Sequence, residues 1–257
     1  MVEMDKREAH ILMASEAEGV DPKLLKERLA SGQAVLPRNT KRKRIRPVAI
    51  GKGLRTKVNA NLGTSADRAE IRFELRKLEA AVKAGADTVM DLSTGGDTDE
   101  VRRAILEESP VPVGTVPIYQ AWIDCVRSGR PLVEATPDEM LRAVRKHIED
   151  GVDFITVHCG VTLKSVEILS RENRITDVVS RGGTFVFEWM SHNDKENPLY
   201  DRYNEILDMA EEYDVTLSLG DGMRPGCIAD ASDKAQIDEL ITLGELVARA
   251  SDRGVQV

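Results

Sequence analysis

A glycine-rich turn near the end of the chain carries residues that could hold a polar, anionic small molecule. Residues Val215 to Leu219 are predicted to form a short buried strand, which runs into Gly220-Asp221-Gly222-Met223-Arg224-Pro225-Gly226. Glycine lets the backbone adopt positive φ and approach a ligand closely, and proline ends the strand. An Asp and an Arg three residues apart can bind such a ligand, although a tight turn with a surface Asp–Arg pair has the same local pattern.

Polar residues also follow other predicted strands. His158 could be a polar anchor or a proton-transfer group, although a lone histidine at a strand end is often structural. Ser180-Arg181-Gly182-Gly183 offers a hydroxyl, a guanidinium and close amides that suit a phosphate, or is an ordinary polar loop. The candidate binding residues at these strand ends are Asn61, Met90, Tyr119, His158, Ser180, Arg181, Gly182, Asp221, Gly222, Met223 and Arg224.

Strands and helices are predicted to alternate from residue 47 onward. Strands are predicted at 46–51, 57–63, 88–92, 112–117, 153–158, 176–179 and 215–219, and another begins at 255–257. Helices are predicted at 98–108, 136–149 (capped by Thr136), 198–213 and 233–252 (capped by Ser232). Three more are predicted: one capped by Ser65 or Asp67, one that starts near Tyr119 and one that ends near Ser170. Residues 184–197 are predicted to be a long loop, in which Trp189, His192 and Asp194 close over a ligand or are simply exposed.

This alternation predicts parallel strands joined by right-handed crossovers, in an open doubly wound sheet or in a (β/α)8 barrel. The doubly wound sheet usually has one dominant glycine-rich phosphate loop after its first strand. The region from Gly51 to Gly63 has neither the G-x-G-x-x-G spacing nor the P-loop spacing of such a loop. In a barrel, residues at all strand ends converge on one pocket. We therefore predict an incomplete (β/α)8 TIM-type barrel over residues 47–257, preceded by a helical extension and basic connector over residues 1–46.

The composition narrows the class of protein. The 257 residues are 41% hydrophobic and 31% charged with a net charge of −8, which predicts a folded chain without general affinity for nucleic acid or anionic membranes. No apolar run approaches the ~20 residues of a membrane span, and no signal-peptide pattern opens the sequence, so we expect a cytoplasmic protein. The basic run at residues 37–46 is interpreted as a solvated connector, with a phosphate-facing arm as the alternative.

Five longer motifs together resemble the phosphomethylpyrimidine synthase family, the radical S-adenosylmethionine enzymes of thiamine biosynthesis. The motifs are Asn59 to Ser65, Met90 to Gly96, Pro117 to Ala121, Ser180 to Gly183 and Leu219 to Gly226. The resemblance implies a (β/α)8 barrel and a carbon–carbon lyase that converts 5-aminoimidazole ribotide to 4-amino-2-methyl-5-phosphomethylpyrimidine. It implies that the candidate residues at the strand ends contact the ribotide. It further implies a 4Fe–4S cluster with S-adenosylmethionine, zinc as a further metal, and a homodimer of the full-length enzyme.

The chain also departs from that family. Val255-Gln256-Val257 begins a strand that the family continues into Glu-Gly-Pro-Gly-His, and later segments bring metal-binding histidines and a Cys-x-x-Cys-x4-Cys motif. The three cysteines here, Cys125, Cys159 and Cys227, have no such spacing, so we expect no metal site in this chain. We expect the amino-terminal portion of such an enzyme, which binds ligand weakly and does not turn over. Its open sheet edges predict poor solubility or pairing with another chain.

Two other functions fit the same residues. One is a different phosphate-binding barrel, an aldolase or isomerase with His158 and Asp221 as acid and base, although Lys83 and Lys164 are predicted to lie on helices rather than at a Schiff-base position. The other is a non-catalytic remnant that binds the ribotide.

Overall fold

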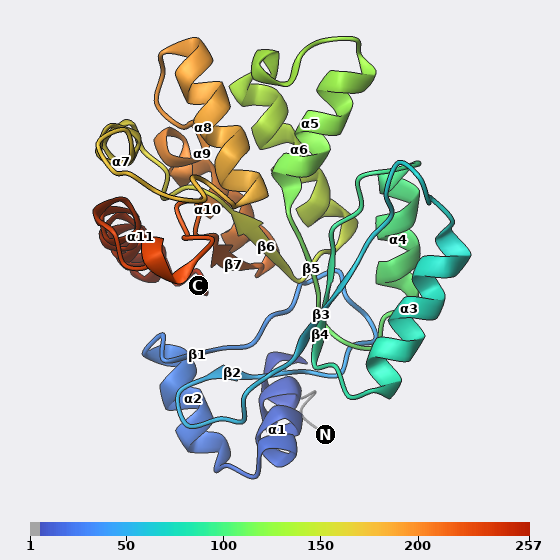
Figure 1. Cartoon of the computed structure of the whole chain (residues 1–257). Coiled ribbons are helices and arrows are strands. Elements are labelled where there is room, and N and C mark those ends of the chain that lie inside the picture. The colour runs from blue at the N-terminus through green and yellow to red at the C-terminus, as the bar shows by residue number, and fades with distance from the viewer. Residues whose placement is uncertain (1–5) are drawn as a thin grey trace.

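The computed structural model describes residues 6–257, which form an α/β fold around a parallel sheet (Figure 1). The strands are β1 (Ala34–Val35), β2 (Ile50–Gly51), β3 (Asn59–Leu62), β4 (Thr88–Asp91), β5 (Val113–Thr115), β6 (Phe154–Val157) and β7 (Thr216–Leu219). The α-helices of these residues are α1 (Lys6–Glu18), α2 (Pro22–Ala30), α3 (Ile71–Lys83), α4 (Thr98–Glu108), α5 (Pro117–Arg127), α6 (Pro137–Asp150), α7 (Leu163–Leu169), α8 (Arg181–Asn193), α9 (Pro198–Asp201), α10 (Tyr203–Tyr213) and α11 (Lys234–Asp252).

Five strands form one parallel sheet in the order β3-β4-β5-β6-β7, so that each strand pairs with the next one along the chain. The amide of Leu217 in β7 donates to the carbonyl of Gln256 (2.8 Å), which places the last residues beside β7. A doubly wound sheet reverses its strand order at a switch point, and this sheet runs in one direction only. The order favours the predicted barrel, and the eight-stranded barrel itself stays a prediction.

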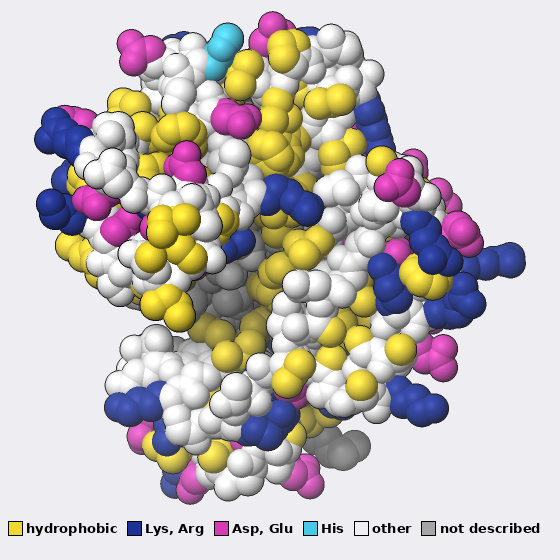
Figure 2. Space-filling view, in the orientation of Figure 1, with side chains coloured by type: hydrophobic (Ala, Val, Ile, Leu, Met, Phe, Trp, Pro, Cys, Tyr) yellow, Lys and Arg dark blue, Asp and Glu magenta, His cyan; other side chains and the backbone are white. Residues whose placement is uncertain are grey.

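The two faces of the sheet differ in chemistry. Val89, Val113 and Ile155 are buried in the main hydrophobic core. Residues next to them in β4 and β6, together with the whole of β7, line a cavity of about 720 Å³, whose other walls come from β1, β2 and α11, and Figure 2 shows the molecule hollowed between the N-terminal elements and the rest. The residues of β3 to β7 that line this cavity are Asn59, Thr88, Met90, Phe154, Thr216, Leu217, Ser218 and Leu219.

The elements before β3 pack as a small unit with its own apolar cluster, in which Ile11, Leu25 and Leu36 are buried. Asp21 caps α2 and accepts a hydrogen bond from the Lys23 amide. The predicted strand at 46–51 is reduced to β2, which pairs antiparallel with β1 rather than joining the parallel sheet. The boundary at residues 46 and 47 stays a prediction.

The prediction for residues 176–197 was wrong. Residues 176–179 have no strand, and α8 occupies most of the predicted long loop. The Trp189 side chain is buried and donates from Nε1 to the Ala135 carbonyl (2.7 Å), while His192 lies in the last turn of α8 and Asp194 at its C-cap. Trp189 therefore cannot close over a ligand. Burial at the helical spacing of Val186, Trp189 and Met190 outweighs the weak helix propensity of two glycines and several aromatic or β-branched residues.

Two predicted helix caps were also wrong, and one was confirmed. Thr136 and Glu139 form a reciprocal capping box at the start of α6. By contrast, α3 begins after Glu70 rather than near Ser65 or Asp67, and Asp233 rather than Ser232 caps α11. Ser232 has positive φ and so lies just outside the helix.

The basic run at residues 37–46 is only partly the solvated connector that was predicted. Lys43 and Arg44 are exposed, but the Arg42 side chain is buried, ion-paired with Asp153 (Nε to Oδ2, 3.3 Å) and bonded to the carbonyls of Leu106 and Ser109. Helix α4 ends at this point, so the guanidinium satisfies carbonyls at a helix C-terminus. Burial raises the pKa of Asp153 to about 6, and Arg42 opposes that rise.

We predict that Arg42→Ala lowers the free energy of unfolding by about 3–5 kcal/mol, because it leaves a buried carboxylate without its cation. The loss should grow as pH rises through about 6, where Asp153 ionises in the folded state. Urea unfolding of the wild type and the variant at pH 5 and pH 8 measures this loss of unfolding free energy. The exposed neighbour Lys43→Ala should change stability by no more than about 0.5 kcal/mol. Equal effects of the two substitutions would show that Arg42 is only a surface charge.

Candidate functional site

His158 directly follows β6, and two glycines pack against its imidazole. A Cβ added at Gly182 would lie 2.2 Å from the His158 ring, and one added at Gly220 would lie 3.0 Å from it. The ring is buried, and its Nδ1 has no hydrogen-bond partner among residues 6–257. The end of β6, the start of α8 and the end of β7 therefore meet at His158, with one polar atom left to serve a ligand.

The imidazole is neutral at physiological pH. Burial is the main cause that lowers the pKa of His158, to about 4, and the nearby Arg224 guanidinium lowers it further. A neutral imidazole offers one donor and one acceptor instead of a positive charge. His158 is therefore suited to hydrogen bonding with a heterocycle rather than to pairing with a phosphate.

The first turn of α8 brings a cation next to an aromatic ring. Ser180 caps the helix by accepting a hydrogen bond from the Gly183 amide (3.2 Å), and the Arg181 guanidinium lies 5.3 Å from the centre of the Tyr119 ring. Burial raises the pKa of Tyr119, whereas the charges of Arg181 and Arg224 lower it. Both arginines therefore act on the same phenol. The amides of a helix N-terminus together with two guanidinium groups favour an anion.

The turn after β7 is fixed by its backbone and exposes its charged side chains. Asp221 and Arg224 are exposed and form an ion pair (Oδ1 to Nη1, 3.2 Å). A Cβ added at Gly183 would lie 2.2 Å from the Gly222 carbonyl oxygen, so the turn touches the start of α8. The Met223 side chain is fully buried, so only a rearranged turn would let it contact a ligand.

Asn61 and Met90 form a second group, on β3 and β4. They are paired in register, and Met90 also pairs with Gly114 of β5, the strand that leads to Tyr119. Strand β3 lies three strands from β6, about 14 Å along the sheet at ~4.8 Å per strand. Direct contacts thus join Tyr119, His158, Arg181, Gly182 and the turn after β7. Met90 lines the 720 Å³ cavity together with Ser218 and Leu219 at the end of β7, and Asn61 is its partner on β3.

Sequence reasoning missed two buried carboxylates that hold strand-end turns. Glu239 of α11 accepts hydrogen bonds from the amides of Gly222 and Met223, and Glu74 of α3 accepts one from the Gly63 amide (2.8 Å). Each glutamate stands on the buried stripe of its helix, and Glu239 follows Ala235 by four residues. The sequence signal for these carboxylates was a glutamate at a position on the apolar face of a predicted helix.

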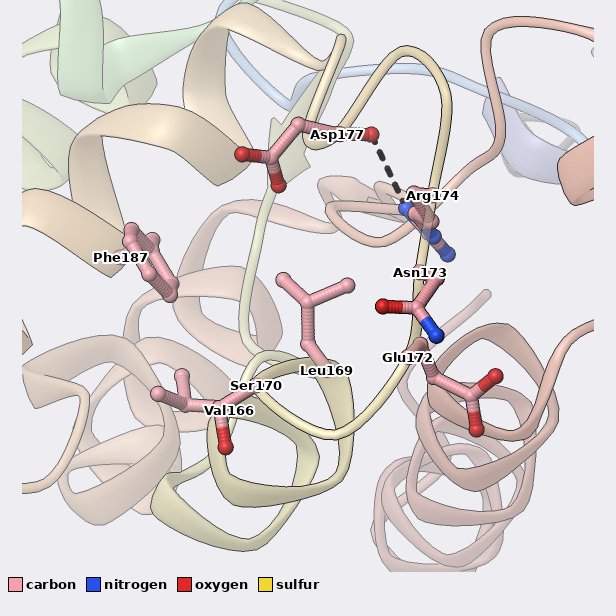
Figure 3. Close-up of a pocket in the computed structure, with 8 residues that line it drawn as sticks. All are labelled: Val166, Leu169, Ser170, Glu172, Asn173, Arg174, Asp177 and Phe187. Carbon is pink, nitrogen blue, oxygen red and sulfur yellow. Dashed lines mark hydrogen bonds between the residues drawn. The ribbon is translucent and has the colours of Figure 1, made fainter.

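A further cavity of about 420 Å³ lies between α7, α8 and the segment that joins them (Figure 3). Val166, Leu169 and Phe187 supply its apolar side chains, and Arg174 donates to the Asp177 carbonyl at its polar side (3.2 Å). None of the predicted binding residues lines it. This cavity is therefore separate from the candidate site.

The described residues do not fit an iron–sulfur cluster. Among residues 6–257, no three His, Cys, Asp or Glu side chains are grouped so that they could hold a metal ion. Cys125 lies in α5 and donates to the Pro131 carbonyl, while burial raises the pKa of Cys159 to about 12. Such a thiol resists the deprotonation that cluster ligation needs.

The sequence matches the radical SAM ThiC family over residues 3–257. The chain belongs to this family. It is 56% identical over 247 residues to the phosphomethylpyrimidine synthase of Desulfitobacterium hafniense, covering 96% of this chain and 57% of that protein. It is 58% identical over 228 residues to the phosphomethylpyrimidine synthase of Moorella thermoacetica, covering 89% of this chain and 53% of that protein.

A third relative, phosphomethylpyrimidine synthase 2 of Syntrophotalea carbinolica, is 56% identical over 240 residues, with 93% of this chain and 56% of that protein covered. The chain therefore spans little more than half the length of the curated relatives it matches. No helix within residues 6–257 has the length and apolar character to cross a membrane. The family expected from the five motifs is confirmed.

We predict that Gly182→Ala destabilises the protein by about 1–3 kcal/mol, because the new methyl group must displace the His158 imidazole from a packed site. Urea unfolding at pH 7 measures the change. Gly244→Ala is the matched control, since Gly244 is also helical and a Cβ there meets nothing within 4 Å. That variant should gain up to about 1 kcal/mol from helix propensity. Stabilisation by both alanines would contradict the close packing of Gly182 on His158.

Proposed function

We propose that this chain carries the ribotide-binding part of a phosphomethylpyrimidine synthase, an enzyme of thiamine biosynthesis. The substrate would be 5-aminoimidazole ribotide, and the product of the whole enzyme 4-amino-2-methyl-5-phosphomethylpyrimidine. Relatives of that name match 93–96% of this chain at 56% identity. The observation that carries the proposal is the meeting of Tyr119, His158, Arg181 and Arg224 around the starts of α5 and α8 and the ends of β6 and β7.

In this proposal the N-terminus of α8 binds the phosphate, and neutral side chains bind the rest of the ribotide. The phosphate lies at the N-terminus of α8, where Ser180, Arg181 and Gly182 supply amides and a guanidinium. The neutral His158, the Tyr119 phenol and Asn61 hydrogen-bond the aminoimidazole and ribose, and Met90 packs on the ring. Asp221, Gly222, Met223 and Arg224 close the site from the side of β7.

We propose that the sheet is part of a (β/α)8 barrel, and that the full enzyme is a cytoplasmic homodimer. The family name supports S-adenosylmethionine with an iron–sulfur cluster as cofactors of a lyase. The cluster ligands and any zinc ligands would lie outside residues 6–257. What this chain contributes is binding and orientation of the ribotide.

An aldolase mechanism fits the geometry less well. Lys164 is exposed and ion-paired with the buried Asp238 of α11, and Lys83 is exposed in the last turn of α3. A Schiff-base lysine needs a desolvated position beside the substrate, which neither residue has. A non-catalytic ribotide-binding role uses the same contacts as the proposed one and differs only in the absence of turnover.

We predict that the chain binds 5-aminoimidazole ribotide more tightly than ribose 5-phosphate, and that Arg181→Ala weakens ribotide binding about tenfold. The removed guanidinium is a charge-assisted phosphate donor, and its loss leaves the helix amides and Arg224, which is already paired with Asp221. Isothermal titration calorimetry of both ligands measures this at low and moderate salt. Arg171→Ala is the control, because Arg171 is exposed just after α7 and its one ion pair within residues 6–257 is with Glu167. Equal affinity for the two phosphates would favour a different phosphate-binding barrel.

We also predict that the 257-residue chain alone does not cleave S-adenosylmethionine. The three cysteines cannot jointly ligate a cluster, since Cys125 and Cys159 are buried at separate places in the fold. The measurement is chromatography of 5′-deoxyadenosine after anaerobic iron–sulfur reconstitution and reduction with dithionite. A full-length relative treated in the same way is the positive control. Turnover by the isolated chain would overturn this part of the proposal.

A further inference from the structure

Glu239 is a buried carboxylate that binds two consecutive backbone amides of the turn after β7. Its Oε1 accepts from the Gly222 amide and its Oε2 from the Met223 amide, both at 2.7 Å. The residue is 1% exposed, and it comes from α11, which follows the turn in the chain. A buried carboxylate is costly unless both of its oxygens are satisfied, and here the backbone satisfies them.

The opposite side of the same backbone is held by Arg174. Its Nη2 donates to the Met223 carbonyl (2.6 Å), and the guanidinium also makes two bonds to Asp233, from Nε to Oδ2 (2.5 Å) and from Nη2 to Oδ1 (2.9 Å). The side chain of Arg174 is 3% exposed. The turn is thus fixed on its amide side by one buried anion and on its carbonyl side by one buried cation.

We propose that Glu239 is a positioning residue for the ribotide: it fixes the Gly222–Met223 backbone so that Asp221 and Arg224 face the ligand and Gly222 supports the start of α8. This role rests on the proposed function. It follows from the close approach of Gly183 to the Gly222 carbonyl, through which a shift of the turn would displace the amides offered to the phosphate. Glu239 acts through the turn, and is not itself placed against the ligand.

The protonation state of Glu239 gives the positioning role a pH dependence that can be measured. Burial raises its pKa to about 7, as does the charge of Asp221, while the two amides and Arg174 lower it. Cys159, which also lies near Glu239, has a pKa of about 12 and stays uncharged. Because the folded pKa is raised, the stability contributed by this group is greatest at low pH and is lost as pH rises through about 7. The hydrogen bonds that Glu239 accepts from the two amides instead strengthen as pH rises, because a carboxylate accepts more strongly than a carboxylic acid.

The first measurement needs no ligand. In the ¹⁵N-labelled 257-residue chain, the amide proton shifts of Gly222 and Met223 should titrate with a midpoint near pH 7. In Glu239→Gln the titration should vanish, and exchange of at least one of the two amides should become about tenfold faster, since the neutral amide has one acceptor oxygen instead of two. Asp238→Asn is the matched control on the same helix, because Asp238 pairs with Lys164 and not with the turn. It should leave both readouts unchanged.

The second measurement is calorimetry with 5-aminoimidazole ribotide at pH 8. Glu239→Gln should weaken binding about tenfold and Asp238→Asn should not, while Glu239→Asp, which keeps the charge on a shorter side chain, should restore part of the affinity and the pH titration. Unchanged amide exchange and ribotide affinity in Glu239→Gln would overturn the proposal. If the wild-type amides titrate but the ribotide does not bind, the proposed function fails and the positioning role with it, although the hydrogen bonds stand.

Discussion

The candidate site depends on backbone contacts so close that they leave no room for side chains. A Cβ at Gly182 would overlap the His158 ring, and one at Gly183 would overlap the Gly222 carbonyl. These two glycines let the start of α8 touch the ends of both β6 and β7. The amides of a helix N-terminus, a neutral imidazole and an Asp–Arg turn consequently share one region. Any larger residue would push α8 away and separate the groups that an anionic heterocycle needs together.

Buried charges are used differently at the two ends of the parallel strands. At the amino end, Arg42 and Asn39 bond to carbonyls at the ends of α4 and α6 and also hold Asp153, which joins the connector to the sheet. At the carboxyl end, Glu74 and Glu239 accept from backbone amides and thereby fix the turns that carry polar side chains. In barrel enzymes the first end serves stability and the second serves function, and the proposed function would give this chain the same division.

The sequence was a good guide where local pattern and tertiary packing agree. Thr136 at the start of α6 and the strand at Thr88–Asp91 were predicted because capping and burial patterns are local. It was a poor guide at α8, where the helix is stabilised by burial of Trp189 against Ala135, a contact 54 residues distant in the chain. Glu239 was missed for the same reason, since only the fold shows which amides its carboxylate meets. Parallel strands bring their carboxyl ends to one edge, so His158, Gly182 and the turn after β7 lie together, and their role in ligand binding stays a prediction.

The charge balance of the site explains why binding by this chain should be weak. Arg181 and Arg224 are the two guanidinium groups near Tyr119, and Arg224 is already paired with the exposed Asp221. His158 adds no charge, because burial holds its pKa near 4. Within residues 6–257, a phosphate would therefore meet one guanidinium that has no ion-pair partner and must compete with Asp221 for the other. Both are exposed, so water and salt screen them. Strong binding needs this region to be shielded from solvent, which would strengthen the arginine contacts without any change in the residues that make them.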